Sequence, residues 1–552
     1  MPYQIKVTSA AIAGIASHWG YFIHREHHKS APTLAWIYVV LAITIYLHEL
    51  LFYDFSTLPA FRDSFAFIAA YAGALCTSMS IYRVFFHRTR SFRGPFLCRV
   101  TKLWHSWQVR DGTNHLYLES LHRKYGTFVR TGPAEITVFT AAGLEAVDGP
   151  GNTCIRGNWA DAFHPDLNII SMRDQRHHDN RRRIWNYAFS VKVALALKSF
   201  ENRLIRHGEH MDQYLQSADG QAVSCNDIFT YYAFDLMGDL SFGKSYDMLN
   251  GGKWPDSILR MRQFMPFFGP MNQSTWLINL GLGLPGCSTD WKAFVLYCKQ
   301  IMKERIEISS YLIEGSIKND TLEQDRHDLE NDAVALIHAG RRPKPSLILH
   351  LDSDTTASAL IYIFYHLATL PIYQKQIRTE LKAISSIANI AELQQLPILS
   401  SFIMETLRLF PPAPTVFPRI SPNKGVTIEG TYIPPNTTIV TPRYCIVRLE
   451  SSFEQPRDFI PERWTTKPWM VRDKRAWVPF SQANNIATGR YSCVAKDWAM
   501  KNLTYVTALL VSKYDISLPP GENGMEVWKD MKDFVTAAPG KLNLVFTKYE
   551  EF

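Results

Sequence analysis

The residues best suited to chemistry lie in the C-terminal part of the chain, where four short motifs follow one another. The first motif opens with Asp354 and Thr355, and the last contains Phe480, Gly489 and Cys493. Asp and Thr commonly cap the free N–H groups at a helix start. A cysteine thiolate is both a nucleophile and a metal ligand, and a glycine allows a tight turn beside it. Because a lone cysteine is more often a small buried apolar residue, this motif alone is a weak signal.

The second and third motifs supply charged groups that can pair. Glu405 and Arg408 stand three positions apart, so on a helix they share one face. Arg463 offers a second cation to the same carboxylate. Taken alone, a Glu and an Arg at this spacing are usually a solvated ion pair.

In this order and spacing, the four motifs resemble those of the cytochrome P450 family of haem-thiolate monooxygenases. The resemblance extends from about Arg83 to the C-terminus. It implies a mainly α fold with small β-sheets, a haem b (iron protoporphyrin IX) cofactor and a monooxygenase activity that uses O2. It also implies that Cys493 is the axial ligand of the haem iron, where a thiolate pushes electron density into the metal.

The resemblance implies supporting roles for the neighbouring motif residues. Phe480 would pack near the proximal face of the haem, and Gly489 would shape the loop that presents the sulfur. Glu405, Arg408 and Arg463 would form a structural ion-pair network that clamps this region.

Further residues would hold and serve the cofactor in a chain of this family. Asp354 and Thr355 would lie over the distal face, where an acid and a hydroxyl can relay protons. His178 and Arg182, four apart, would hold the haem propionates, because an arginine fork can bind both oxygens of a carboxylate. Arg419 is a further candidate for a propionate contact.

The elements that must position these residues follow from apolar periodicity. Beyond a basic hinge at residues 83–96 no second linker is visible, so we expect one large haem domain over residues 93–552. Apolar spacing predicts helices over residues 190–217, 226–249, 289–316, 354–370 and 373–387, and short strands over 426–433, 438–442 and 542–547.

The first 92 residues are expected to form a membrane anchor with two to three transmembrane helices, over residues 7–23, 33–53 and 64–82. The second stretch has 21 residues, enough to cross the hydrocarbon core. Residues 83–102 carry six basic and no acidic side chains, so this flank is expected to be cytoplasmic. Three spans place the N-terminus in the lumen and the haem domain in the cytosol, on a membrane that we expect to be the endoplasmic reticulum. The alternative is that the first stretch lies in the membrane interface.

Composition excludes several other classes of protein. The chain has 552 residues with 46% hydrophobic and 20% charged residues, which is ordinary for a globular protein. Its eight cysteines form no CxxC pair, which excludes a zinc finger and a disulfide-rich scaffold. The net charge of +8 is mild, and the basic run at 181–183 has no second basic cluster beside it in the domain, so we expect no nucleic-acid partner. A GxGxxG match at 281–286 contains Pro285 and lacks a surrounding βαβ pattern, so it is not taken as a dinucleotide site.

Two segments depart from the family pattern. Residues 341–352 separate an Ala-Gly pair from the Asp354 motif, and residues 483–488 lengthen the loop before Cys493. Pro343 and Pro345 would break a helix at the oxygen-binding bend. We interpret both segments as unspliced or wrongly annotated sequence, and a transcript that retains both would exclude this. If they are genuine, the chain is expected to bind haem with impaired or non-monooxygenase activity.

Partners and substrate follow only from the resemblance. No flavin-binding module is present, so electrons would come from a separate NADPH-cytochrome P450 reductase. The runs around residues 93–96, 125–133 and 234–244 look like those of fungal secondary-metabolism members, which implies a hydrophobic small-molecule substrate. A third possibility, a membrane structural protein without haem, would require the ordered motifs to be accidental.

Overall fold

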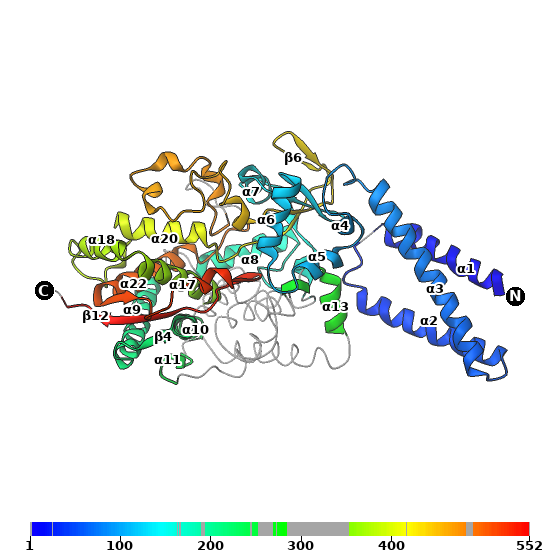
Figure 1. The fold of residues 1–552 in the computed structure, drawn as a ribbon, viewed down its shortest axis with the longest axis horizontal. Helices are drawn as coiled ribbons and strands as arrows, with labels where there is room; N and C mark the ends of the chain where they lie inside the picture. The colour runs from blue at the N-terminus through cyan, green and yellow to red at the C-terminus, as the bar shows by residue number, and fades with distance from the viewer. Residues whose placement is uncertain are drawn as a thin grey trace.

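The structure is a computed structural model. It describes residues 3–24, 26–162, 164, 167–188, 194–242, 245–251, 269–271, 273–283, 353–415, 417–481 and 490–550. A narrow arm formed by the N-terminal helices projects from a large body that contains the rest of the described chain (Figure 1).

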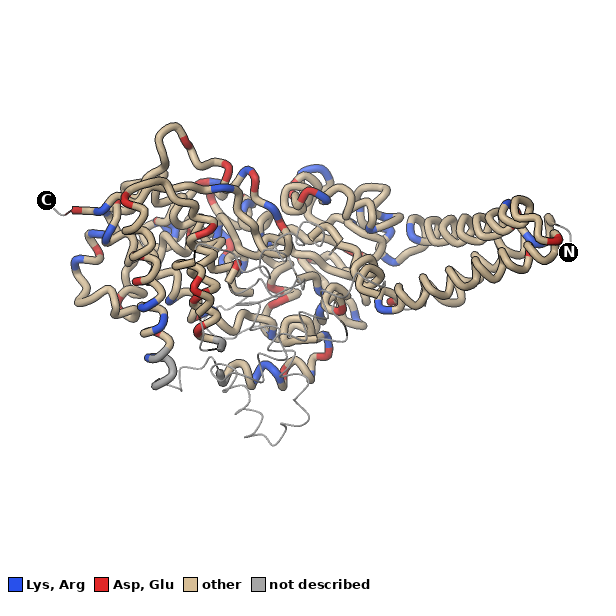
Figure 2. Tube along the Cα trace, turned by 90° about the horizontal axis from the view of Figure 1, so that it is seen from below, with Lys and Arg blue, Asp and Glu red and all other residues tan. Residues whose placement is uncertain are grey.

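The arm consists of three helices, and the middle one runs antiparallel to the other two. They are α1 (Tyr3–Ser17), continued by a π-helical turn at His18–Phe22, α2 (Ala31–Phe52) and α3 (Thr57–Ile81), continued by a π-helical turn at Tyr82–Phe86. Among the described residues, Ala31–Phe52 and Thr57–Phe86 are long and apolar enough to cross a membrane. Charged residues are sparse along the arm and gather at its tip and near the body (Figure 2). The second and third predicted stretches, residues 33–53 and 64–82, therefore correspond to helices that are long and apolar enough to span a bilayer.

The first predicted stretch is helical, but α1 is shorter than the two candidate spans and packs along α3. A Cβ atom added to Gly14 would lie 2.3 Å from the carbonyl oxygen of Tyr71, so the two backbones touch where glycine leaves room. Lys6 Nζ lies 2.7 Å from Glu49 Oε1, which joins α1 to α2 near the tip. The arm is thus a packed three-helix unit.

The body is mainly α-helical with small β-sheets, as the sequence predicts. At its centre lie α10 (Cys225–Phe242), α17 (Ser353–Thr369), α20 (Pro397–Leu409) and α22 (Lys496–Lys513). Most residues of α17 beyond its first turn are buried, which explains why that part of the helix is largely apolar on all of its faces. The other helices are α4 (Phe96–Val100), α5 (Lys102–Gln108), α6 (Asn114–Tyr125), α7 (Ala141–Asp148), α8 (Gln175–Ala188), α9 (Ala194–Ser217), α11 (Met248–Gly251), α13 (Thr275–Gly283), α18 (Pro371–Leu381), α19 (Ile390–Leu393), α21 (Arg443–Ile446) and α23 (Glu526–Lys529), with 3₁₀ turns at η3 (Asn158–Asp161), η4 (Pro461–Trp464), η5 (Pro468–Met470) and η6 (Lys474–Ala476).

The sheets are small and flank the helices. The largest described sheet has the order β1-β2-β8-β5-β3, in which β2 and β8 are parallel and the other neighbours antiparallel. The strands are β1 (Phe128–Gly132), β2 (Glu135–Val138), β3 (Ile155–Arg156), β4 (Ala222–Ser224), β5 (Arg419–Ile420), β6 (Val426–Ile428), β7 (Thr431–Ile433), β8 (Thr438–Val440), β9 (Tyr514–Ser517), β10 (Lys532–Phe534), β11 (Thr536–Ala538) and β12 (Asn543–Lys548).

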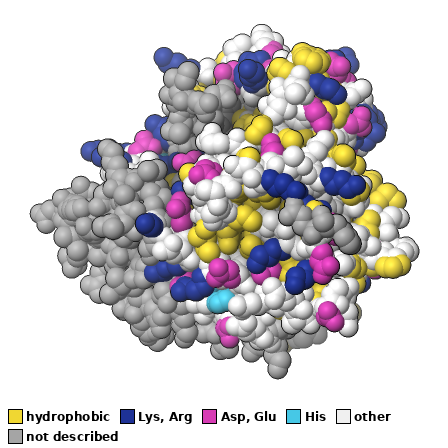
Figure 3. All heavy atoms as spheres, turned by 90° about the vertical axis from the view of Figure 1, so that its left-hand side faces the viewer, with side chains coloured by type: hydrophobic (Ala, Val, Ile, Leu, Met, Phe, Trp, Pro, Cys, Tyr) yellow, Lys and Arg dark blue, Asp and Glu magenta, His cyan; other side chains and the backbone are white. Residues whose placement is uncertain are grey.

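Most predicted elements are present with shifted ends. The predicted strand at 426–433 is wrong as a single strand, because Glu429 and Gly430 adopt positive φ and turn the chain into the β6–β7 hairpin. The helix predicted at 289–316 lies outside the described residues. At the end of the body farthest from the arm, basic and acidic side chains are interspersed around an apolar patch (Figure 3).

Candidate functional site

A large cavity lies in the body between α8, α17, α22 and the loop that carries Cys493. Its empty space, including the part that is open to solvent, amounts to about 1430 Å³. Much of its described wall is apolar, with Ile169, Trp185, Met237, Ala359 and Phe417 among the lining residues. A cavity lined by apolar groups and a few convergent polar ones is suited to a hydrophobic ligand.

Cys493 lines this cavity, held by its own loop and by α8. Its backbone N–H donates to the carbonyl oxygen of Phe480 at 2.9 Å. Arg182 donates to the backbone carbonyl and, at 3.0 Å, to the hydroxyl of the preceding Ser492. The sulfur also lies just ahead of α22, whose N-terminus carries a partial positive charge. A nearby guanidinium and a helix N-terminus both favour the thiolate form.

Four buried cysteines are poor metal ligands by comparison. Burial raises the pKa of Cys154 to about 11 and raises the pKa values of Cys98, Cys225 and Cys445 as well. These thiols therefore stay protonated at neutral pH, whereas a metal binds the thiolate.

Arginines converge on the wall beside Cys493. Arg156 on β3 pairs directly opposite Arg419 on β5, and the ring of Tyr491 lies 4.6 Å from each guanidinium carbon. Like charges opposite each other in a sheet repel. Asp148 offsets part of this charge, since its carboxylate lies 2.7 Å from Arg419 Nη2 and 3.5 Å from Arg443 Nη2.

The cluster has unused capacity to bind an anion. Arg156, Arg182, Arg419 and Arg443 line the cavity, and no Asp or Glu is among the described lining residues. Arg156 Nε, Arg443 Nε and the Tyr491 hydroxyl are buried and have no hydrogen-bond partner within the described part of the chain. Burial, and then the charge of Arg419, lower the pKa of Arg156 to about 9. Carboxylates in this cavity would supply both the missing acceptors and the missing charge.

His178 lies in the same cluster as a neutral ring. Burial, and then the charges of Arg156 and Arg182, lower the pKa of His178 to about 2. Its Nδ1 lies 3.3 Å from Asp179 Oδ1 and its Nε2 3.5 Å from Arg156 Nη2. In this arrangement the His178 ring contacts the Arg156 guanidinium, and Arg182 binds the Cys493 loop through Ser492.

Across the cavity, the first turn of α17 presents hydroxyl groups. Thr355 and Thr356 line the cavity, while the partly buried Asp354 in the same turn is not among the lining residues. The structure thus places one of the two predicted distal residues on the cavity wall and the other beside it.

The ion-pair network lies outside the cavity and is buried. Arg408 binds Glu405 through Nε at 2.8 Å and Nη2 at 2.9 Å, and Arg463 Nε binds the same carboxylate at 3.0 Å. All three side chains are fully buried. The Trp464 indole and the Ile460 N–H also donate to Glu405, at 3.0 and 2.9 Å. One carboxylate thus ties α20 to η4 and the segment before it.

The structure brings most of the predicted residues together. Cys493, Phe480, His178, Arg182, Arg419 and Thr355 all line one cavity. Gly489, the insertions 341–352 and 483–488, and the Ala-Gly pair before the first insertion lie outside the described residues. Sequence reasoning missed Arg156 and Arg443, and no local motif marks either of them.

Comparison with known proteins identifies the family. A sequence profile of the family "Cytochrome P450" matches residues 95–543. The cytochrome P450 monooxygenase notG' of Aspergillus versicolor is 32% identical, with 97% of each chain covered. Tryprostatin B 6-hydroxylase of Aspergillus fumigatus is 31% identical over 97% of this chain and 95% of its own. Cytochrome P450 monooxygenase lcsK of Purpureocillium lilacinum is 28% identical over 99% of both chains. The cavity with its cysteine and arginine cluster is consistent with a haem site. The sequence matches show that the chain belongs to the cytochrome P450 family, whose members bind haem b.

Proposed function

We propose that this chain is a membrane-anchored haem-thiolate monooxygenase that oxidises a hydrophobic small molecule in fungal secondary metabolism. The observation that carries the proposal is the cavity itself, because Cys493 lines it together with an arginine cluster in which Arg156 Nε and Arg443 Nε lack acceptors among the described residues. A haem has one iron for the sulfur and two propionates for the guanidiniums.

The residues present fit haem b. Cys493 would ligate the iron, and Arg156, Arg419 and Tyr491 would hold the propionates. When bound, the haem supplies the site for activating O2. The apolar wall would exclude water and orient a hydrophobic substrate, while the Thr355 hydroxyl would hold a proton at the cavity wall.

Membrane anchoring and the electron donor are parts of the same proposal. The candidate spans α2 and α3, followed by a basic flank, support a multi-pass anchor in the endoplasmic reticulum with a cytosolic haem domain. Arg176 and Arg183 are exposed on α8, the helix that touches the Cys493 loop. Positive charge near the thiolate suits an acidic docking face on an NADPH-cytochrome P450 reductase.

Reduced protein and carbon monoxide test the haem, and NADPH consumption tests the reaction. A Soret band at the thiolate position, followed by substrate-dependent product formation with reductase, is the expected result. Product formation with no NADPH consumption would favour a haem protein with non-monooxygenase chemistry, an alternative raised by the insertions 341–352 and 483–488. Protein that takes up no haem would overturn the proposal.

Thr355→Ala is expected to separate electron use from product formation. Without the hydroxyl at the cavity wall, proton delivery weakens, and product formation should fall about 10²-fold while the carbon monoxide spectrum stays unchanged. Thr369→Ala, at the other end of α17, is the matched control, because its hydroxyl donates to backbone carbonyls of its own helix, at Tyr365 and His366. The ratio of product to NADPH consumed is measured; equal ratios in both variants would show that Thr355 has no such role.

Tyr491→Phe is expected to speed haem release by about 5- to 10-fold, because it removes one hydrogen bond from a buried carboxylate and keeps the ring between the arginines. Transfer of haem to apomyoglobin measures the rate. The control is Tyr505→Phe, whose hydroxyl bonds the Ile205 carbonyl at 3.4 Å. If both variants release haem at the wild-type rate, the Tyr491 hydroxyl does not bind the cofactor.

A further inference from the structure

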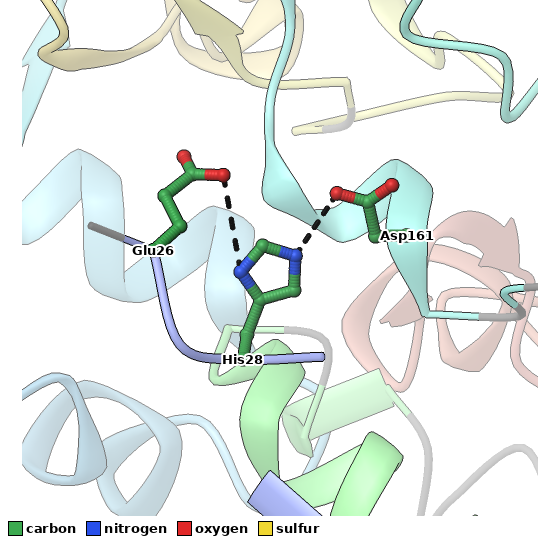
Figure 4. A group of neighbouring side chains, drawn as sticks. All are labelled: Glu26, His28 and Asp161. Carbon is green, nitrogen blue, oxygen red and sulfur yellow. Dashed lines mark hydrogen bonds and ion pairs between the residues drawn. The ribbon is translucent and has the colours of Figure 1, made fainter. Parts of the chain in front are cut away.

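The loop between α1 and α2, here called the anchor loop (residues 26–30), is fastened to the body by a buried carboxylate. Asp161, at the end of η3, is 1% exposed. It accepts a hydrogen bond from His28 Nε2 at 2.9 Å, and Lys29 Nζ lies 2.9 Å from its other oxygen. Figure 4 shows the His28 ring lying between Asp161 and Glu26. The arm is therefore joined to the body by charged contacts besides the covalent chain.

Arg173 extends this contact toward the cavity. Its Nη1 lies 2.8 Å from Glu26 Oε2 and 2.5 Å from Asp161 Oδ2, so it binds the anchor loop and η3 together. Its Nε donates to the backbone carbonyl of Arg156 at 3.2 Å. Arg156 is the cavity-lining arginine opposite Arg419. One guanidinium thus links the anchor loop to the backbone of a residue on the cavity wall.

The other side of the anchor loop rests on α13. Asn279 Nδ2 donates to the backbone carbonyl of His28 at 3.0 Å. A Cβ atom added to Gly283 would lie 2.4 Å from Cβ of Pro32, so this glycine is what lets α13 reach the start of α2. Gly283 belongs to the GxGxxG match at 281–286, and its lack of a side chain allows a close packing contact between helices.

Glu26, His28 and Asp161 could be taken for a metal site, because each offers one ligand atom within 4.8 Å of the others. The positive charge already present excludes this interpretation. The Arg173 guanidinium lies between Glu26 and Asp161, where a cation would sit, and Lys29 binds the second oxygen of Asp161. Burial would raise the pKa of Asp161, but hydrogen bonds from His28, Arg173 and Lys29 and the charge of Arg173 outweigh it and hold the pKa well below its usual range.

We propose that the anchor loop is a positioning element of the cofactor pocket, acting through Asp161 and Arg173 on the segment that carries Arg156. The inference rests on the proposed function, because Arg156 matters only if the cavity holds a carboxylate-bearing cofactor. Asp161 and Arg173 are positioning residues and do not contact the cofactor. The arm then has a second role besides attaching the enzyme to a membrane, because the anchor loop at its body end helps to position the cavity wall.

The test uses full-length protein in lipid nanodiscs with substitutions in the anchor loop, remote from the cavity. In the double variant His28→Ala/Lys29→Met, we expect faster amide hydrogen exchange at residues 155–162 and 167–173, and haem release to apomyoglobin about 5-fold faster or more. The single variant Lys29→Arg, with His28 unchanged, keeps a positive charge beside Asp161 and should behave like the wild-type protein. Lys6→Met breaks the similar ion pair with Glu49 at the far end of the arm and should change neither quantity at this segment.

The outcomes separate this inference from the proposed function. Unchanged exchange in the double variant would overturn the contact between loop and wall, whatever the cofactor. Faster exchange with unchanged haem release would overturn the link to the pocket. If the wild-type protein takes up no haem, both the proposed function and the role of the anchor loop in the cofactor pocket are wrong. The exchange data alone then decide whether the anchor loop stabilises residues 155–162 and 167–173. Lys6→Met acting like the double variant would also overturn the inference, because the effect would then reflect general loosening of the arm.

Discussion

Cys493→Ala abolishes the thiolate signature in the carbon monoxide spectrum of the reduced protein and eliminates substrate oxidation: this is the largest effect that we expect. The sulfur is the cavity-lining cysteine, with Arg182 bound to the adjacent residue and the N-terminus of α22 just beyond it. Alanine offers no ligand atom, so any remaining haem is held through a weaker ligand with a shifted band. The measurement is a reduced carbon monoxide difference spectrum on protein of known haem content.

Cys225→Ala provides the matched control for this prediction. Cys225 is fully buried at the start of α10, and burial raises the pKa of its thiol, so it is not a thiolate. We expect this variant to keep the wild-type spectrum even if its stability falls somewhat. An unchanged spectrum in Cys493→Ala would mean that another residue binds the iron.

The second largest effect is expected for Glu405→Gln. This substitution keeps the shape of the side chain but removes the charge that offsets Arg408 and Arg463, and all three groups are fully buried. Breaking a buried ion pair from one side costs about 3–5 kcal/mol, because it leaves an uncompensated buried charge. We expect little folded, haem-loaded protein and a much lower midpoint in denaturant-induced unfolding of what is recovered.

Glu454→Gln is the control for this network. Glu454 pairs with Arg472 at 3.6 Å, and both side chains are more than two-fifths exposed, so its loss should cost about 1 kcal/mol or less. The two glutamates thus differ in burial and also in pairing, since Glu405 accepts several short hydrogen bonds and Glu454 makes one long ion pair with Arg472. Similar unfolding midpoints for both variants would contradict the assignment of Glu405 as the residue that holds α20 to η4.

The part of the site that the sequence predicts is carried by short motifs. Glu405 and Arg408 are predicted to pair because helical geometry fixes which side chains share a face. Phe480 and Cys493 are thirteen positions apart in neighbouring parts of one motif, and the structure joins them by one backbone hydrogen bond. The apolar part of α17 and the candidate membrane spans α2 and α3 are likewise visible as long hydrophobic segments.

The part that could not be predicted depends on contacts between distant segments. Arg156 lies on a strand of two residues, too short for any alternation, and it reaches the cavity only because β3 pairs with β5 in this register. The orientation of Arg182 toward Ser492 is likewise set by how α8 packs on the Cys493 loop. Such placements are decided when the sheet and helices assemble.

By itself, then, the sequence determined the family, the cysteine that we propose as metal ligand and the apolar arm, because these depend on residue type, order and local periodicity. The tertiary structure alone decided that Arg156 and Arg443 line the same cavity as that cysteine, and that Asp161 is a buried anion bound by His28, Lys29 and Arg173. The physical reason is that a charge is costly to bury unless its partners come with it. Those partners lie far apart along the chain, so only the folded arrangement brings them together.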